Sequence, residues 1–156
     1  MDTITLEPMT EEQYRRYRES AEVDYARGIA ASGAMPEPDA RQKAHDDYAR
    51  LLPDGLGTEG HRLWAAYAGD VEVGMVWLHL RRKSDGLHAF GYDFEVREEL
   101  RRRGHGRAIM EAVERVCRDL GVVSIGLSVF GFNQGARRLY EQMGFETTTV
   151  QMRKRL

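Results

Sequence analysis

The stretch RRRGHGRA, residues 101–108, decides the fold. It lies between an aromatic and β-branched run that ends at Val96 and an apolar helical stripe that starts at Ile109. Helix N-termini leave backbone N–H groups unpaired and carry partial positive charge, and glycines let the main chain approach an anion closely. The stretch therefore predicts a turn that cradles a phosphate or pyrophosphate. A glycine-rich turn with solvated arginines is the alternative.

The spacing of the glycines excludes two common nucleotide-binding motifs. Ile109 occupies the position where a dinucleotide fingerprint has its third glycine, and the preceding strand ends an antiparallel meander. No Gly-Lys-Ser or Gly-Lys-Thr follows that would bind a nucleoside triphosphate. The loop is thus spaced for another phosphate-bearing ligand.

The segments around this loop alternate between helical and strand periodicity. Thr10 with Gln13 predicts a capping box that opens a helix, and Pro53 ends a second helix that starts near Asp39. Strands are expected at residues 3–7, 63–68, 71–80, 87–96, 122–130 and 145–152, and later helices at 109–120 and 133–143. This order predicts one α/β domain over residues 1–156.

A second motif, Asn133-x-x-Ala136-x-x-Leu139-Tyr140-Glu141-x-x-Gly144-Phe145, follows the glycine loop. The ordered pair of motifs resembles the GNAT superfamily of acyl-CoA-dependent N-acyltransferases, and the likeness covers nearly the whole chain. The resemblance implies a mixed, mostly antiparallel central sheet flanked by helices and splayed between two central strands to admit acetyl-CoA. It also implies a bacterial subgroup whose acceptor the sequence does not identify, and the preference for arginine over lysine suggests a GC-rich bacterial genome.

By this resemblance, the backbone of Phe94 and Val96 pairs with the pantetheine arm of acetyl-CoA. The pyrophosphate lies against the loop residues Arg101, Arg102, Arg103, Gly104, His105, Gly106 and Arg107. Asn133 binds the arm, and Tyr140 protonates the departing thiolate. A phenol with a pKa near 10 is protonated at neutral pH, so it has a proton to give. A helix N-cap for Asn133 and a core position for Tyr140 are the alternatives.

Acyl transfer to an alkylamine needs a base, because such an amine is mostly an ammonium ion near pH 7. Period-2 alternation places Phe90, Tyr92, Phe94 and Val96 on one face of a strand and Ala89, Gly91, Asp93 and Glu95 on the other. Glu95 is the first candidate for the general base and Asp93 the second. A solvated acidic strand face is the alternative interpretation.

Composition narrows the function classes. The 23 basic and 25 acidic residues give a net charge of −2, which argues against nucleic-acid binding despite the arginine run. No apolar window is long enough for a membrane span, and residues 1–10 lack the features of a signal peptide, so a cytoplasmic protein is expected. Cys117 is the single cysteine, and the five histidines show no metal-ligand spacing. No metal is therefore expected.

Two function classes remain open. The first is an N-acetyltransferase that moves an acetyl group from acetyl-CoA directly to a primary amine of a small molecule, peptide or protein. The second is a non-catalytic acyl-CoA-binding regulatory domain. Tyr140 favours the enzyme, because cofactor binding alone does not require a proton donor at the sulfur. The sheet edges and the final strand also offer surfaces for a homodimer.

Overall fold

The computed structural model describes residues 3–156. Five strands, four α-helices and two short 3₁₀ turns follow one another in these residues. In chain order they are β1 (Ile4–Pro8), α1 (Glu11–Ala31), α2 (Glu37–Leu51), η1 (Gly55–Gly57), β2 (His61–Ala68), β3 (Val71–Lys83), β4 (Gly86–Val96), η2 (Glu98–Leu100), α3 (His105–Asp119), β5 (Val122–Leu127) and α4 (Gln134–Gln142). None of these helices is long and apolar enough to cross a membrane.

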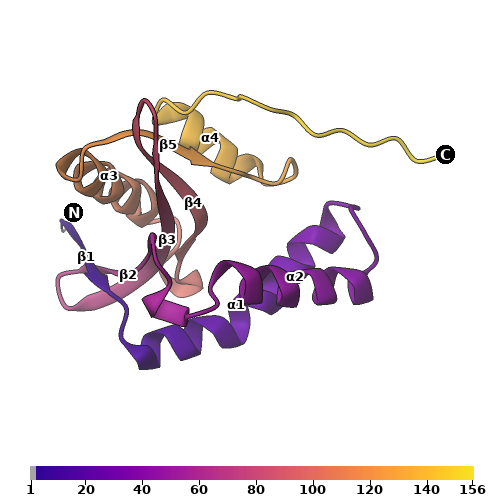
Figure 1. Cartoon of the computed structure of the whole chain (residues 1–156), viewed down its shortest axis with the longest axis horizontal. Helices are drawn as coiled ribbons and strands as arrows, with labels where there is room; N and C mark the ends of the chain where they lie inside the picture. Colours follow the sequence, from indigo (N-terminus) through magenta and orange to yellow (C-terminus); the bar gives the residue numbers. More distant parts are fainter. Residues whose placement is uncertain (1–2) are drawn as a thin grey trace.

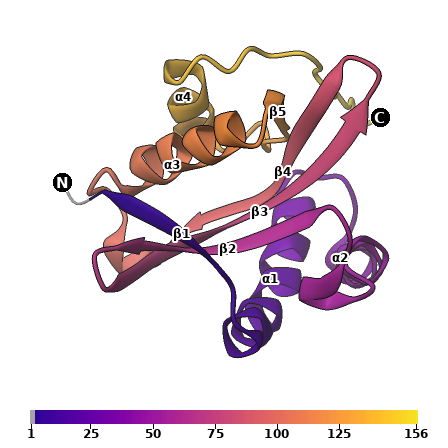
Figure 2. The same ribbon diagram turned by 60° about the vertical axis from the view of Figure 1, so that its left-hand side comes forward.

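The strands form one mixed sheet in the order β1-β2-β3-β4-β5. Neighbours pair antiparallel from β1 to β4, and β4 pairs parallel with β5. Helices α1 and α2 cover one face, whereas α3 and α4 lie on the other (Figures 1 and 2). The mostly antiparallel α/β fold predicted from the sequence is confirmed.

Local sequence signals account for the helices that border the loop and the sheet. Thr10 caps α1 through a capping box with Gln13, as predicted. Helix α3 buries its apolar stripe against the sheet, with Ile109 and Val113 fully enclosed. Its last buried residue, Cys117, is a free thiol in the same core. These contacts fix the start of α3 beside the end of β4.

The predicted strand at residues 145–152 is wrong for the folded chain. After α4 the chain has no regular secondary structure and pairs with no strand among residues 3–156, and Val150 and Met152 are exposed. The Phe145 N–H donates instead to the Tyr140 carbonyl at 2.9 Å, which closes the end of the helix. Strand propensity alone did not form a strand, because no sheet edge lies beside the segment.

The predicted alternation along β4 is also wrong, because a β-bulge interrupts it. Trp77 pairs with Asp93 and Leu78 with Gly91, so Tyr92 is an extra residue. Phe90 and Tyr92 therefore share the α1 side of the sheet with Asp93, and Tyr92 stacks on Trp77. The opposite face carries Ala89, Gly91, Phe94 and Val96. Strict period 2 cannot anticipate one inserted residue.

Gly74 of β3 is required by a close approach of two backbones. A Cβ at this position would lie 2.1 Å from the carbonyl oxygen of Glu95 and 3.1 Å from Ile109 Cδ1. We expect Gly74→Ala to destabilise the protein by about 1–3 kcal/mol, because β4 must shift to admit the methyl group. The shift would fall where β4 borders the candidate site.

The midpoint of denaturant unfolding measures this effect, with Gly91→Ala as the matched control. At Gly91 the nearest atoms would lie 3.7 Å from the added Cβ, an ordinary contact, so we expect a change of less than about 1 kcal/mol. Equal stability of the two variants would contradict the close approach at Gly74.

Candidate active site

The parallel strands β4 and β5 separate where the candidate site begins. Their pairing runs from Leu87 with Val122 to Gly91 with Leu127 and stops there. Among the described residues, no strand lies along the far edge of residues 92–96. The sheet is therefore splayed between two of its strands, as predicted.

The glycine loop connects this opened part of β4 to the N-terminus of α3. Gly104 is the N-cap and has a φ of 82°, and Arg102 has a φ of 63°, the one positive φ of a non-glycine residue within 3–156. Left-handed residues in a turn aim successive N–H groups into a concave anion site, and such backbone conformations cluster at ligand sites. The turn precedes a helix of four turns, which adds its partial positive charge.

The side chains of the loop are only partly free. Arg101 donates from Nε to the Val96 carbonyl at 3.1 Å, and Arg107 donates to Gln142 Oε1 at 2.8 Å. Arg102 and Arg103 are exposed. His105 Nδ1 is buried and has no hydrogen-bond partner among residues 3–156. A buried polar atom without a partner is unusual, and a polar ligand atom at the loop would satisfy it.

Asn133 is the N-cap of α4 in this structure. Its Oδ1 accepts from the Ala136 N–H at 3.2 Å. The cap holds one end of α4 while Tyr140 follows seven positions later on the same helix, close to one face. The capping alternative is therefore observed, and the side-chain amide of Asn133 is left for other contacts.

Asp93 is held in place by a relay of hydroxyl groups on the α1 side of the sheet. The Tyr17 hydroxyl donates to Asp93 Oδ2 at 2.6 Å, and the Phe94 N–H donates to Oδ1 at 2.9 Å. Because Tyr17 uses its proton here, the Tyr48 hydroxyl donates to Tyr17, at 3.1 Å. Burial raises the pKa of Asp93 above its usual range, and the two hydrogen bonds partly oppose that rise.

Glu95 lies on the same side and borders a cavity of about 350 Å³ between α1 and the ends of β3 and β4. Burial raises the pKa of the Glu95 carboxyl above its ordinary value, the charges of Asp93 and Asp24 add to the rise, and Arg101 opposes it. The lining residues are Met9, Gln13, Arg16, Tyr17, Ser20, Glu72, Gly74, Met75, Glu95, Arg97, Glu98 and Glu99.

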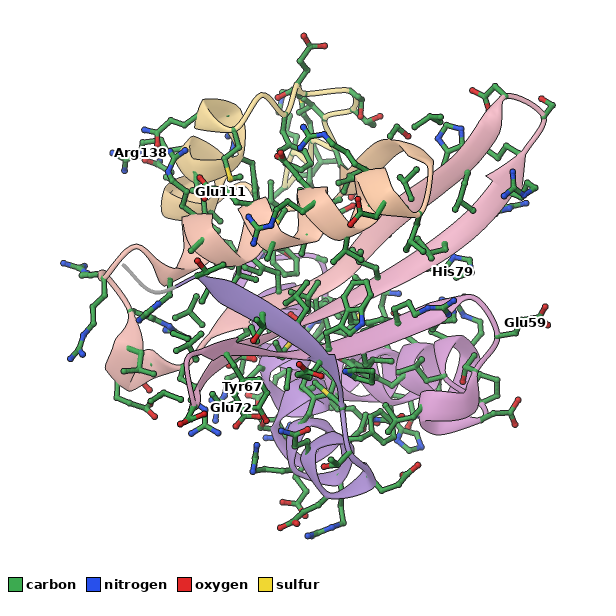
Figure 3. The ribbon with its side chains drawn as sticks, turned by 90° about the vertical axis from the view of Figure 1, so that its left-hand side faces the viewer. Glu59, Tyr67, Glu72, His79, Glu111 and Arg138 are labelled. Atoms are coloured by element: carbon green, nitrogen blue, oxygen red, sulfur yellow. The ribbon has the colours of Figure 1, made fainter. Side chains whose placement is uncertain are left out.

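Glu72, another carboxylate of this cavity, is held by three side-chain partners. It accepts from Gln13 at 3.0 Å and from Arg16 at 2.8 Å, and it pairs with Arg97. Figure 3 shows Tyr67 and Glu72 side by side, where β2 pairs with β3. Because its oxygens already bind Gln13, Arg16 and Arg97, Glu72 is poorly placed to accept a proton from a substrate. Of these two carboxylates, Glu95 is therefore the better candidate for the general base.

Tyr140 lies on α4, across the opened edge of β4. Its ring centroid is 6.3 Å from that of Phe94 and 5.5 Å from that of Phe145. Burial raises the pKa of the Tyr140 hydroxyl to about 12, with a smaller contribution from the negative charge of Asp93. The phenol is therefore protonated throughout the neutral range. Asp93 and Glu95 thus lie on the α1 side of the sheet, whereas Tyr140 packs against Phe94 of the opposite face, so the three groups flank the free edge of β4 from two sides.

Sequence reasoning missed an aromatic cluster beside Asp93. Trp77 donates a hydrogen bond from Nε1 to His61 Nδ1 at 2.9 Å. The rings of His61 and His79 stack with their centroids 4.3 Å apart, and those of Trp77 and Tyr92 stack with their centroids 4.8 Å apart. Burial lowers the pKa of His61 to about 4, with a further contribution from His79, so His61 is neutral at pH 7. Its signal in the sequence was alternation in β3, which places Trp77 and His79 on one face.

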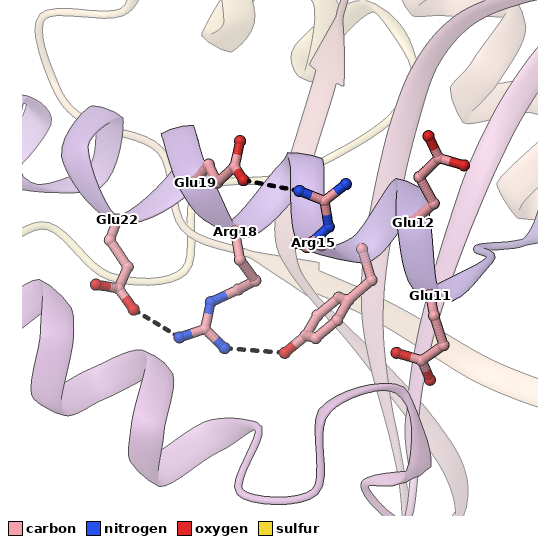
Figure 4. A pocket seen from close by; sticks show the side chains of 7 residues that line it. Glu11, Glu12, Arg15, Arg18, Glu19 and Glu22 are labelled. Carbon is pink, nitrogen blue, oxygen red and sulfur yellow. Dashed lines mark hydrogen bonds and ion pairs between the residues drawn. The ribbon is translucent and has the colours of Figure 1, made fainter.

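A larger hollow, of about 990 Å³, lies along the outer surface of α1 and takes no part in this site. Figure 4 shows two ion pairs among its charged side chains, Arg15 with Glu19 and Arg18 with Glu22. All of its lining residues come from α1: Glu11, Glu12, Tyr14, Arg15, Arg18, Glu19 and Glu22. Volume alone therefore does not locate the chemistry, and we place the site at β4.

The sheet is mixed and opens between two parallel strands, beside a glycine-rich helix N-terminus. This is the arrangement that the resemblance to GNAT acyltransferases implied. The chain belongs to the Acetyltransferase (GNAT) family, which residues 12–145 match. The predicted family is thereby confirmed.

Two relatives from Bacillus subtilis (strain 168) match almost the full length of the chain. The uncharacterized N-acetyltransferase YycN is 36% identical over 155 residues and covers 99% of each chain. The uncharacterized N-acetyltransferase YdgE is 32% identical over 158 residues and covers 98% of each. The crystal structure of YycN, a putative acetyltransferase, superposes with a TM-score of 0.95 at 35% identity, over 99% of both chains. The chain is thus similar to N-acetyltransferases in both sequence and structure.

Proposed function

We propose that this protein transfers an acetyl group from acetyl-CoA directly to a primary amine. One observation carries the proposal: the β4–β5 pairing ends at Gly91, so the free edge of β4 lies between the glycine loop and Tyr140. The membership in the GNAT family agrees with this reaction, since that family commonly uses acetyl-CoA as donor. The acceptor is a small molecule, a peptide or a protein.

The donor would bind along the opened edge of β4. The backbone of Phe94 and Val96 would pair with the amide groups of the pantetheine arm, as a strand would. The pyrophosphate would lie at the loop of residues 101–107, where the left-handed Arg102 and Gly104 shape the turn. In this position Arg101 would exchange its bond to the Val96 carbonyl for a phosphate oxygen.

The acceptor amine would reach the thioester from the α1 side, through the cavity that Glu95 borders. Glu95 would take a proton from the ammonium group, directly or through a water molecule, and Asp93 is the second candidate for this base. The raised pKa of each carboxyl makes it a better proton acceptor than an ordinary carboxylate. Residues Glu98 and Glu99 add negative charge to the same cavity, which favours a cationic acceptor.

The transfer itself would need no covalent enzyme intermediate. The amine nitrogen attacks the carbonyl carbon, a C–N bond forms, and the C–S bond breaks. The nitrogen would give one proton to the base before it attacks and a second one as the C–S bond breaks. The departing thiolate would take a proton from Tyr140, and the second nitrogen proton, carried by a water molecule, would restore the phenol. Cys117 lies in the core against α3, and burial raises the pKa of its thiol to about 11, which disfavours the nucleophilic thiolate.

A non-catalytic acyl-CoA-binding domain is the second candidate. It would use the same splay and the same loop, so binding alone does not separate the two functions. Tyr140 and Glu95 face the opening from two sides, and chemistry rather than binding requires both. We therefore favour the enzyme.

The test measures binding and reaction separately. We expect acetyl-CoA to raise the melting temperature while NAD does not, because the loop lacks the third glycine of a dinucleotide site. We further expect thiol release from acetyl-CoA with at least one member of a broad panel of primary amines. Stabilisation by NAD alone would contradict the donor site, and binding without any thiol release would favour the non-catalytic domain.

The variant Gly106→Val tests whether acetyl-CoA binds beside the glycine loop. A Cβ at Gly106 would lie 3.5 Å from Leu139 Cδ2 and 3.7 Å from Phe94 Cζ, so the branched methyl groups would fill the space between β4 and α4. Gly106 has no positive φ, unlike Gly104, so the helix start is preserved. We expect a folded variant whose affinity for acetyl-CoA falls at least about tenfold. Unchanged affinity would place the donor elsewhere.

A further inference from the structure

An aromatic strip lies on β4 next to the two candidate bases. Its members are Phe90 and Tyr92, which share the α1 side of the sheet with Asp93. The two rings meet edge to face with their centroids 4.9 Å apart, and Phe90 is 36% and Tyr92 39% exposed. Adjacent apolar rings that stay exposed beside a candidate active site are typical of a surface that binds a ligand.

The β-bulge places the Tyr92 ring directly beside Asp93. In a regular strand the side chains of two successive residues point to opposite faces, whereas here both lie on the α1 side. The Tyr92 ring stacks on that of Trp77, which is buried. The indole of Trp77 is fixed in turn by its hydrogen bond to His61 Nδ1. The orientation of the Tyr92 ring is therefore set before a ligand binds, which lowers the cost of binding.

The charges along β4 favour a cation at one end of this surface and a neutral group at the other. Burial raises the pKa of both Asp93 and Glu95, and the negative charge of Asp24 on α1 adds to each rise, so a third carboxylate lies near the two. At the aromatic end, burial lowers the pKa of His61 to about 4 and also lowers that of His79. Both imidazoles are therefore neutral at pH 7, and neither repels an ammonium group.

We infer that the acceptor is a primary amine that carries an aromatic ring, with the ring on Phe90 and Tyr92 and the nitrogen at Asp93 and Glu95. This inference rests on the proposed acetyl transfer and names the acceptor class for it. At a rise of about 3.3 Å per residue, Tyr92 lies about 3 Å from Asp93 and about 10 Å from Glu95 along the strand. A chain of two to four carbon atoms between the ring and the nitrogen spans this range.

A second ammonium group is the other kind of ligand that an aromatic face binds. Trp77 is the strongest cation binder of the cluster, yet it is buried and stacked against Tyr92. A ligand therefore meets Phe90 and Tyr92, whose accessible surface is mostly apolar. Covering this surface with a neutral ring buries apolar area on both partners and desolvates no further charge. The aromatic strip thus favours a ring over a second cation.

Three amines with the same four-carbon chain test the inference: 4-phenylbutylamine, n-butylamine and butane-1,4-diamine. Thiol release from acetyl-CoA gives kcat/KM for each. We expect the value for 4-phenylbutylamine to exceed that for n-butylamine at least about tenfold, because only the former buries a ring. The two monoamines have nearly the same basicity, so the ratio reports on the ring and not on the fraction of neutral amine. We expect butane-1,4-diamine to fall below 4-phenylbutylamine as well.

The variant Tyr92→Ala should bring the ratio of the two monoamines close to one, and a ratio is insensitive to a general loss of activity. Tyr14→Ala is the matched control, since it removes a ring from the outer hollow of α1, and it should leave the ratio unchanged.

The outcomes separate this inference from the proposed function. Equal kcat/KM for the two monoamines, a higher value for the diamine than for 4-phenylbutylamine, or an unchanged ratio in Tyr92→Ala would each overturn the acceptor class while acetyl transfer stands. Thiol release with no amine of a broad panel would overturn the proposed function, and the acceptor class with it.

Discussion

Tyr140→Phe is expected to lower turnover by a factor of about 10²–10⁴ while the affinity for acetyl-CoA changes little. The substitution keeps the ring that packs against Phe94 and Phe145 and removes the hydroxyl. At a pKa of about 12 that hydroxyl is protonated at neutral pH, so its loss removes the proton donor for the thiolate. Steady-state thiol release and the thermal shift with acetyl-CoA measure the two quantities separately.

Tyr25→Phe is the matched control for this prediction. The Tyr25 hydroxyl donates to Asp47 of α2 at 3.2 Å, on the side of the molecule away from α4. Its loss should leave turnover within a few-fold of the original value. Full activity of Tyr140→Phe with a reactive amine would remove Tyr140 from the acid role, and a parallel fall in affinity would show that the hydroxyl binds the donor.

Glu95→Gln is expected to lower turnover at pH 7 by a similar factor of about 10²–10⁴, because the amide cannot accept the proton of the ammonium group. The pKa of Glu95 is raised, so in the original enzyme kcat/KM should fall as the pH drops through a value above that of an ordinary glutamate. The variant should recover part of its rate as the pH rises, because more of the acceptor is then already neutral. The pH profiles of kcat/KM for both proteins test this.

Two variants separate the candidates for the base. Glu98→Gln changes a carboxylate that lines the same cavity, and we expect its kcat to stay within a few-fold of the original. Asp93→Asn removes the charge that Tyr17 and the Phe94 N–H hold in place. A larger loss in Asp93→Asn than in Glu95→Gln would assign the base to Asp93. Equal small losses would contradict a carboxylate base on β4.

Short-range signals were sufficient for much of the fold. The Thr10 capping box, the apolar stripe of α3 and the turn that precedes α3 depend on neighbours a few positions apart, so the sequence alone predicted these local structures correctly. The phosphate-binding role of the turn stays a prediction. The ordered motifs at residues 101–108 and 133–145 identified the family, which the match over residues 12–145 confirmed. Such features persist in any chain that contains them, because their partners are local.

The details of the site depended on contacts between distant parts of the chain. The bulge at Tyr92 arises in the pairing of β3 with β4, and it reverses the predicted faces of Phe90 and Tyr92. The hydroxyl relay from Tyr48 to Asp93 joins three elements. Neither follows from periodicity, because one inserted residue or one distant hydroxyl leaves no trace in the local pattern.

The last segment shows the same division. Residues 147–152 have the composition of a strand, and the sequence determined that preference. Whether they form one depends on a free edge with unpaired backbone groups, and within this chain the segment does not lie on such an edge. The composition of the segment is a local property, so the sequence determined it. A strand also needs a neighbouring strand edge for its backbone hydrogen bonds, and only the tertiary structure decides whether such an edge lies beside it.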